Sequence, residues 1–210
     1  MAAYPNVIAP KFEEVFRTDF GLKGRWAEEV FGNRNPLVLE LGCGKGEYTV
    51  ALARKYPEKN FIGVDVKGAR MWVGATDALQ NHLTNAAFLR TRIEFIRSCF
   101  APGELSEIWI TFPDPQPQQS RENRRLTSDR FLRSYREILQ TGGIVHLKTD
   151  SESLFEYTCN VVKSNNLRVL VCTGDLYHSG YVDDILSVRT YYEKMFMDKG
   201  FTIKYLKFLL

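Results

Sequence analysis

The stretch LVLELGCGKGEY, residues 37–48, constrains the fold more than any other part of this sequence. An apolar run contains Glu40, three glycines follow at alternate positions (Gly42, Gly44 and Gly46), and a segment of helical period begins. A strand that enters a helix through such a turn is typical of open α/β sheets, whose ligands bind outside the carboxyl ends of the strands. Glycine lets the backbone approach a ligand without a Cβ in the way. The stretch therefore predicts a ligand-binding turn in an α/β domain.

Apolar runs alternate with segments of helical period along the rest of the chain, which predicts a mainly parallel sheet covered by helices. We expect seven strands, at residues 36–42, 60–66, 86–91, 105–112, 143–149, 167–174 and 201–210. Helices are expected between them, and two of these open with a serine suited to the N-cap, Ser128 and Ser151. The interpretation is a three-layer, Rossmann-like domain over residues 36–210. Residues 1–35 form an N-terminal extension that either covers part of a site or only packs.

Composition excludes several classes of protein. With 210 residues, 44% of them hydrophobic, the chain suits one folded domain and argues against disorder. No run is apolar over the roughly 18 residues that a membrane helix needs, and the start MAAYPNVIAPKF lacks the pattern of a signal peptide, so we expect a soluble, cytoplasmic protein. The four cysteines lie far apart without a CxxC pair, so neither a zinc site nor a disulfide framework is expected.

The spacing and charge of the glycine turn indicate its ligand. Dinucleotide sites favour G-x-G-x-x-G with a pyrophosphate at the helix N-terminus, whereas this turn reads G-x-G-x-G and follows the carboxylate of Glu40. An acid is unfavourable beside a phosphate but suits the amino group or sulfonium of S-adenosylmethionine. Asp65 ends the next strand, where an acid accepts ribose hydroxyls. A nucleotide site and a purely structural turn are the alternatives.

Two further acids follow strands and are expected at the same edge of the sheet. Asp114 follows the strand at 105–112 in the sequence FPDPQP, whose prolines stiffen the loop, and Asp150 follows the strand at 143–149. With Glu40 and Asp65 they predict a group of carboxylates around a cationic cofactor. The alternative is that Asp114 and Asp150 only cap turns or helices.

The segment 118–136 is strongly basic. The net charge of the whole chain is only +3, but this segment carries six arginines against Glu122 and Asp129, a local balance of +4. A concentrated positive charge of this kind indicates contact with nucleic acid phosphates, and the candidates are Arg124 and Arg125, which follow Asp114 by about ten residues. The alternative is a solvated helix face.

The chain resembles the tRNA (guanine-N7-)-methyltransferases. The matching stretches are LELGCGKGEYTVALARKYP, FIGVDV, FPDPQP, RRLTSDRFLRSYREIL, GGIVHLKTDSESLFEYT and RTYYEKMFMDKG, in that order over most of residues 37–200. The resemblance implies a class I methyltransferase fold that takes a methyl group from S-adenosylmethionine. It further implies that the group goes to N7 of a guanine in the variable loop of tRNA.

The resemblance and the motifs together assign residues to roles. Cofactor-binding residues are Glu40, Gly42, Gly44, Gly46, Asp65, Arg92 and Asp114, catalytic residues are Asp114 and Asp150, and substrate-binding residues are Gln118, Arg124, Arg125, Asp150, Thr190, Tyr191, Tyr192 and Glu193. Within the segment TYYEKMF, base stacking is considered for Tyr192 and helix packing for Tyr191 and Phe196.

The chain departs from the family pattern at two places. Arg92 stands where the family usually has an acid for the adenine amino group, and arginine cannot accept that hydrogen bond. Gln116 and Gln118 stand where the family often has tryptophan and lysine, so a charged substrate contact becomes neutral. The nearby arginines then take over phosphate binding, or activity is lower, or the RNA substrate differs.

The chemistry of the reaction agrees with these residues. Guanine N7 carries an unprotonated lone pair, so attack on a sulfonium methyl needs alignment and negative charge but no general base. The three histidines are isolated, and no G-x-S-x-G or metal-ligand spacing occurs. Two rival classes stay open: a dinucleotide-dependent oxidoreductase and a noncatalytic RNA-binding module with a degraded cofactor pocket. The sequence does not decide between a monomer and a homodimer.

Overall fold

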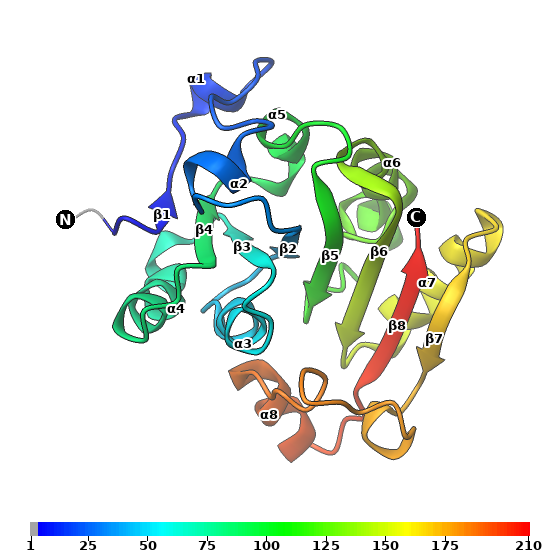
Figure 1. Cartoon of the computed structure of the whole chain (residues 1–210). Coiled ribbons are helices and arrows are strands. Elements are labelled where there is room, and N and C mark those ends of the chain that lie inside the picture. Colours follow the sequence, from blue (N-terminus) through cyan, green and yellow to red (C-terminus); the bar gives the residue numbers. More distant parts are fainter. Residues whose placement is uncertain (1–3) are drawn as a thin grey trace.

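The computed structural model describes residues 4–210, which form one mixed sheet with helices on both of its faces (Figure 1). The strand order is β1-β4-β3-β2-β5-β6-β8-β7. The strands are β1 (Val7–Ile8), β2 (Leu37–Leu41), β3 (Asn60–Asp65), β4 (Ala86–Arg90), β5 (Leu105–Thr111), β6 (Leu139–Thr149), β7 (Val169–Thr173) and β8 (Lys204–Leu209). The class I methyltransferase fold is thereby confirmed, with eight strands in place of the expected seven.

The additional strand is β1, which lies within the N-terminal extension and pairs in parallel with β4. Two residues carry no alternation of polar and apolar side chains, so this strand is defined only by its partner. A second difference is that β6 starts at Leu139, not near residue 143, because Leu139 pairs with Leu105 before the register shifts. The positive φ of Gly142, +73°, accompanies this irregularity.

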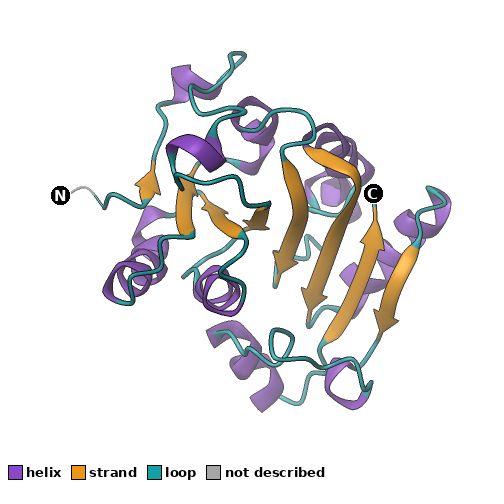
Figure 2. Ribbon diagram, in the orientation of Figure 1, coloured by secondary structure: helices purple, strands orange, loops and turns teal. Residues whose placement is uncertain are grey.

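The strands from β1 to β6 pair in parallel, and β8 runs antiparallel between β6 and β7. Figure 2 shows the arrow of β8 pointing opposite to those of β5 and β6. The carboxyl ends of β2, β3, β5 and β6 therefore meet at one edge of the sheet, where a class I fold binds its ligands.

Helices cover the two faces of the sheet. They are α1 (Phe12–Val15), α2 (Trp26–Glu29), α3 (Glu47–Lys55), α4 (Gly68–Gln80), α5 (Ile96–Cys99), α6 (Asp129–Ile138), α7 (Glu152–Ser164) and α8 (Tyr191–Asp198), with 3-10 helices η1 (Ile93–Phe95), η2 (Gln119–Arg124) and η3 (Leu176–His178). Leu39 and Leu41 of β2 face the apolar core under α5, α6 and α7, whereas Val38 faces the core under α3 and α4. The alternation of side chains along a strand thus produces the three layers.

Residues 4–35 pack on the sheet edge and on α5. Trp26 is completely buried, stacks on Phe100 with 5.2 Å between ring centroids, and donates from Nε1 to the backbone oxygen of Cys99 over 2.8 Å. This part of the extension therefore contributes to the core, and the boundary at residue 35 stays a prediction. Within residues 4–210, no helix is long and apolar enough to cross a membrane.

The two serines expected at helix N-caps both occupy that position. The hydroxyl of Ser151 accepts from the backbone N–H of Leu154 over 3.3 Å at the start of α7. The hydroxyl of Ser128, at the start of α6, instead donates to the backbone oxygen of Asn123 over 3.5 Å. Ser151 caps its helix directly, while Ser128 joins α6 to η2.

Candidate functional site

A cavity of about 510 Å³ opens at the carboxyl edge of the sheet. Its walls come from the glycine turn after β2, the end of β3, the loop after β5, the end of β6 and the segment that leads into α8. They include Glu40, Gly42, Gly44, Asp65, Thr111, Asp114, Asp150, Thr190, Tyr192 and Phe196. All four acids that the sequence places at strand ends line this one cavity, and their individual roles stay predictions.

All three glycines of the turn have a positive φ, a backbone conformation that favours glycine. Gly42, Gly44 and Gly46 have φ values of +75°, +55° and +73°. A Cβ on Gly42 would meet no atom within 4 Å, so it would extend into open space. A Cβ on Gly46 would lie 2.5 Å from Cε1 of Phe88. The first glycine therefore leaves room for a ligand, and the third permits close packing of α3 on the sheet.

Glu40 is a buried acid held by three hydrogen bonds. Its carboxylate accepts from the backbone N–H of Thr49 over 2.8 Å, from the hydroxyl of Thr49, and from the hydroxyl of Thr111 over 2.6 Å. Burial nevertheless raises the pKa of Glu40 to about 7, with the hydrogen bonds opposing the shift. A buried acid with a raised pKa gains stability when a cation lies beside it. The chemistry at this position suits a positively charged ligand.

Asp65 joins the end of β3 to the glycine turn. Its Oδ2 accepts from the backbone N–H of Gly44 over 3.0 Å, and its Oδ1 accepts from the backbone N–H of Lys67 over 2.8 Å. These two bonds hold the carboxylate at the cavity wall in a defined orientation. Each oxygen retains acceptor capacity, which suits a ligand with vicinal hydroxyl groups.

A second cavity, of about 500 Å³, adjoins the first, and both are lined by Gly42, Asp65 and Leu126. Arg92, predicted as a cofactor residue, lines only this second cavity, together with Thr91 and Glu94 among others. Asp65 is therefore common to the walls of both cavities.

The Asp114 loop is shaped by its own side chain. Oδ1 of the exposed Asp114 accepts from the backbone N–H of Gln116 over 3.0 Å, which closes a short turn. Phe112 and Gln116 on either side have positive φ values of +47° and +45°. Residues other than glycine rarely adopt a positive φ, and such backbone strain is often found at functional sites.

Asp150 also lines the cavity, directly after β6. Its backbone oxygen accepts from Nζ of Lys204 over 3.0 Å, whereas its carboxylate makes no hydrogen bond or ion pair with a side chain among residues 4–210. Burial raises the pKa of Asp150, which indicates a partly desolvated acid. A carboxylate that faces a cavity in this state can accept hydrogen bonds from a bound base.

The predicted substrate segment 190–193 divides into residues inside and outside the cavity. Thr190 and Tyr192 line the cavity, as does Phe196 one helical turn later. The half-exposed Tyr191 instead lies outside, where Nζ of Lys45 is 4.0 Å from its ring centroid. The helix packing considered for Phe196 is present as well, since its ring stacks on Phe112 at 6.4 Å.

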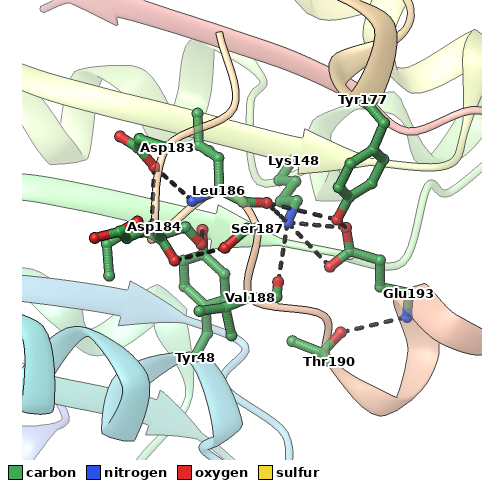
Figure 3. Close-up of polar contacts among 11 residues, drawn as sticks. Tyr48, Lys148, Tyr177, Asp183, Asp184, Leu186, Ser187, Val188, Thr190 and Glu193 are labelled. Atoms are coloured by element: carbon green, nitrogen blue, oxygen red, sulfur yellow. Dashed lines mark hydrogen bonds and ion pairs between the residues drawn. The ribbon is translucent and has the colours of Figure 1, made fainter. Parts of the chain in front are cut away.

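Glu193, also predicted to bind substrate, is completely buried and does not line the cavity. Its carboxylate pairs with Nζ of Lys148 at 2.8 Å and accepts from the hydroxyl of Tyr177 over 2.5 Å (Figure 3). The carboxylate of Glu193 therefore contacts other residues of the protein core and does not face the cavity. Lys148 was missed from the sequence, although a lysine amid the apolar run GIVHLKT was a signal that could have identified it.

The predicted substrate residue Gln118 and the predicted phosphate-binding residues Arg124 and Arg125 lie at the start of η2, at its end and just after it. Gln118 and Arg124 are exposed, and Arg124 lines the second cavity together with Arg92. Arg125 is partly buried. Its Nε donates to the backbone oxygen of Gln116 over 3.2 Å, and its guanidinium lies 4.3 Å from the ring centroid of Tyr157. Arg125 thus holds the Asp114 loop as well as adding positive charge.

The described residues do not form a metal centre. Within residues 4–210, no group of three or more His, Cys, Asp or Glu side chains is placed to hold a metal ion. The other side chains that sequence reasoning missed are Thr49 and Thr111, which bind Glu40. No local pattern distinguishes them from ordinary threonines.

Comparisons with known proteins agree with this geometry. Among solved structures, the crystal structure of the 16S rRNA methyltransferase KamB has a TM-score of 0.65 at 16% identity and covers 87% of this chain and 91% of its own. A 16S rRNA (adenine(1408)-N(1))-methyltransferase from Catenulisporales acidiphilia has a TM-score of 0.60, also at 16% identity, over 89% and 90% of the two chains. These similarities establish the fold alone.

Sequence comparison is more specific. A family described as "Putative methyltransferase" matches residues 34–206. The tRNA (guanine-N(7)-)-methyltransferase of Bacteroides thetaiotaomicron is 54% identical over 210 residues, which cover 100% of this chain and 82% of the relative. The enzyme of the same name from Porphyromonas gingivalis is 51% identical over 99% and 86% of the two chains. With this identity along its whole length, the chain belongs to the tRNA (guanine-N(7)-)-methyltransferase family.

Proposed function

We propose that this protein transfers a methyl group from S-adenosylmethionine to N7 of a guanine in the variable loop of tRNA. The observation that carries the proposal is the convergence of Glu40, Asp65, Asp114 and Asp150 on one cavity beside the glycine turn. Family membership supports the identity of both substrates. Because tRNA is the proposed substrate, we also propose that the protein acts in the cytoplasm.

The residues of the glycine turn fit S-adenosylmethionine. A Cβ on Gly42 would fill open space beside the turn, and the buried Glu40 has a raised pKa that a nearby cation would lower. We assign Glu40 and Asp114 to the cationic methionine end of the cofactor and Asp65 to its ribose. When bound, S-adenosylmethionine supplies an activated methyl group on a positively charged sulfur.

The second cavity suits the adenine of the cofactor. It shares Asp65 with the first cavity but not Glu40, so we propose that a ligand whose ribose meets Asp65 extends its base toward Thr91 and Arg92. Arg92 is exposed and offers only donors, whereas adenine presents ring nitrogens that accept. We therefore assign Arg92 to the adenine end as a donor or a cover for the ring.

Asp150 is the proposed guanine-binding acid. Guanine N1–H and the 2-amino group are donors on one edge, and a carboxylate that faces the cavity can accept from both. N7 then turns away from Asp150 with its lone pair free. As N7 takes the methyl group, the purine becomes positively charged, and the negative charges of Asp150 and Asp114 favour that charge. No residue needs to remove a proton from N7.

The wall formed by Thr190 and Tyr192 completes the guanine side. Tyr192 lines the cavity with a ring on which a base can stack, and such stacking contributes about 1–3 kcal/mol per base. The methylated guanine belongs to a folded RNA, so it must leave its own stack to reach the cavity. A ring that accepts the displaced base offsets part of that cost.

The exposed side chains of η2 are proposed to contact the tRNA backbone. Gln118, Arg121 and Arg124 are exposed beside the loop that carries Asp114. Phosphates next to the target nucleotide are expected here because the basic segment 118–136 has a net charge of +4, which exceeds the net charge of +3 of the whole chain.

The decisive experiment is to incubate the protein with methyl-labelled S-adenosylmethionine and bulk tRNA, digest the tRNA, and identify the labelled nucleoside. We expect 7-methylguanosine, located in the variable loop. In a parallel reaction with ribosomal RNA, labelling of that RNA but not of tRNA would indicate another RNA substrate. Binding of tRNA without binding of S-adenosylmethionine would show instead a noncatalytic RNA-binding module.

A further inference from the structure

A buried ammonium group holds the segment that closes the guanine side of the cavity. Lys148 lies near the end of β6 and is completely buried. Its Nζ is 2.8 Å from Oε1 of Glu193 and donates to the backbone oxygens of Leu186 and Val188 over 2.9 and 3.1 Å (Figure 3). One side chain therefore binds both the irregular chain before α8 and the helix itself.

We call Lys148, with its bonds to Leu186, Val188 and Glu193, the anchor of residues 181–198. The anchor is needed because this segment has little regular secondary structure. Residues 181–190 include no helix or strand, and α8 is only eight residues long. A helix of this length is not stable in water without tertiary contacts. Asp183 shapes the chain locally by accepting from the backbone N–H groups of Ile185 and Leu186 over 2.9 and 2.7 Å.

The anchor also has a second partner outside the cavity. The hydroxyl of Tyr177 on η3 donates to Oε1 of Glu193 over 2.5 Å, and Tyr177 does not line the cavity. The carboxylate of Glu193 is thus shared between Lys148 and Tyr177. Burial lowers the pKa of Lys148, and the neighbouring Glu193 opposes that shift. The ion pair is the reason a lysine can be tolerated here.

The position of Glu193 in α8 determines which neighbouring side chains face the cavity. Tyr192 precedes it and lines the cavity, and Phe196 lies one turn beyond Tyr192 on the same wall. Thr190, at the N-cap, accepts from the backbone N–H of Glu193 over 3.3 Å and lines the cavity too. When Glu193 is drawn onto Lys148, these three side chains are held facing the cavity.

We propose that Lys148 and Glu193 are positioning residues for the guanine substrate: their buried ion pair holds Thr190 and Tyr192 in place, and neither group touches the base. This inference rests on the proposed function and narrows it, because it removes Glu193 from the residues that contact guanine. It predicts that changes to the ion pair act on tRNA and leave the cofactor side unaffected.

The variants must separate positioning from loss of fold. Removing one member of a buried ion pair leaves the other uncompensated and is strongly destabilising, whereas replacing both with neutral groups of similar volume is often tolerated. The informative set is therefore Glu193→Gln, the double variant Lys148→Met with Glu193→Gln, and Tyr177→Phe. The matched control is Tyr205→Phe, which removes a 2.7 Å hydrogen bond to His146 from a buried tyrosine whose hydroxyl is not bonded to Lys148, Tyr177 or Glu193.

Steady-state methylation of tRNA and titration with S-adenosylmethionine form the main readout. In Tyr177→Phe and in the double variant, KM for tRNA should rise about fivefold or more, while Kd for S-adenosylmethionine stays within about twofold. Tyr205→Phe should leave both values unchanged. A merely structural role would instead alter cofactor binding and tRNA kinetics together.

Two outcomes overturn the proposal. If Glu193→Gln abolishes methylation in a folded protein while Tyr177→Phe and the double variant keep the parent KM, Glu193 acts on the substrate itself. Hydrogen–deuterium exchange of residues 183–198 gives a readout that does not need activity. If the parent fails to methylate tRNA, the proposed function falls, and exchange alone decides: faster exchange in the variants supports the anchor, and unchanged exchange refutes it.

Discussion

The backbone N–H of Gly44 donates to Oδ2 of Asp65 over 3.0 Å, which joins the glycine turn after β2 to the end of β3. The acid proposed to bind ribose thus also orders the turn proposed to bind the rest of the cofactor. One carboxylate therefore serves two neighbouring strands, and a change to it affects the whole cofactor half of the site.

Asp65→Asn should weaken S-adenosylmethionine binding by about 10- to 100-fold, because one hydrogen bond to a charged group contributes about 1.5–3 kcal/mol. Asparagine retains an oxygen for one backbone N–H but loses the charge and one acceptor. Isothermal titration measures the affinity, and tRNA binding of the same variant serves as the control. Unchanged cofactor affinity would remove Asp65 from the ribose site.

Cofactor binding should release a proton at mildly acidic pH. Burial raises the pKa of Glu40 to about 7, so at about pH 6 the free protein holds this acid mostly protonated. A cation beside Glu40 lowers that pKa, so binding should release close to one proton at about pH 6 and almost none at about pH 8. Titration in two buffers of different ionisation enthalpy measures the release. Glu40→Gln should show none, and equal release by both proteins would refute the assignment.

The same acid should affect stability in a defined direction. Because folding raises the pKa of Glu40 above its ordinary value of 4.5, its contribution to the free energy of unfolding is fully present below that value and is lost as pH rises through about 7. Urea unfolding without cofactor at several pH values should show this decline, and Glu40→Gln should reduce it. Parallel pH profiles for the two proteins would contradict the expectation.

Asp150→Asn should lower the turnover of tRNA by at least about tenfold, since it removes one charge-assisted hydrogen bond and the negative charge that favours a cationic purine. The affinity for S-adenosylmethionine should change little because Asp150 follows β6, whereas Glu40 and Asp65, assigned to the cofactor, belong to β2 and β3. Single-turnover methylation with saturating cofactor measures the effect. Turnover near that of the parent would place guanine elsewhere in the cavity.

Arg124 and Arg125 should behave differently, although both were predicted to contact phosphates. Arg124→Ala should flatten the slope of log K for tRNA against log salt by about 0.7–0.9, the value for one lost phosphate contact. Arg125→Ala also removes contacts with Gln116 and Tyr157, so it should disturb the Asp114 loop and lower turnover as well. Binding curves at several salt concentrations distinguish the two. Identical lines for Arg124→Ala and the parent would show a solvated arginine.

Gly46→Ala should destabilise the protein by about 2–4 kcal/mol, because the new Cβ would lie 2.5 Å from Phe88 in a backbone with positive φ. Gly142→Ala is the matched control: its φ is also +73°, but a Cβ there meets no atom within 4 Å. Urea unfolding should therefore give about 1–2 kcal/mol for the control. Equal losses would show that backbone strain, not the approach of α3 to β4, requires the glycine.

The sequence by itself determined the features that depend on local pattern. The apolar strands, the glycine turn and the acids at strand ends follow from the order of residues, because parallel strands bring their carboxyl ends to one edge. For this reason Glu40, Asp65, Asp114 and Asp150 were predicted at one site and do line one cavity. The seven longer strands were located from their apolar runs, apart from the start of β6.

Only the tertiary structure decided the direction in which chemically similar side chains point. Glu193 and Asp150 are both acids in motifs of the same family, yet Glu193 turns into the core toward Lys148 while Asp150 faces the cavity. Arg124 and Arg125 are neighbours, but only Arg125 lies over Tyr157, and β1 is a strand only because β4 is beside it. These differences depend on contacts between residues that are distant in the sequence. Such a contact forms only when the folded chain brings the two residues together, so no local pattern predicts it.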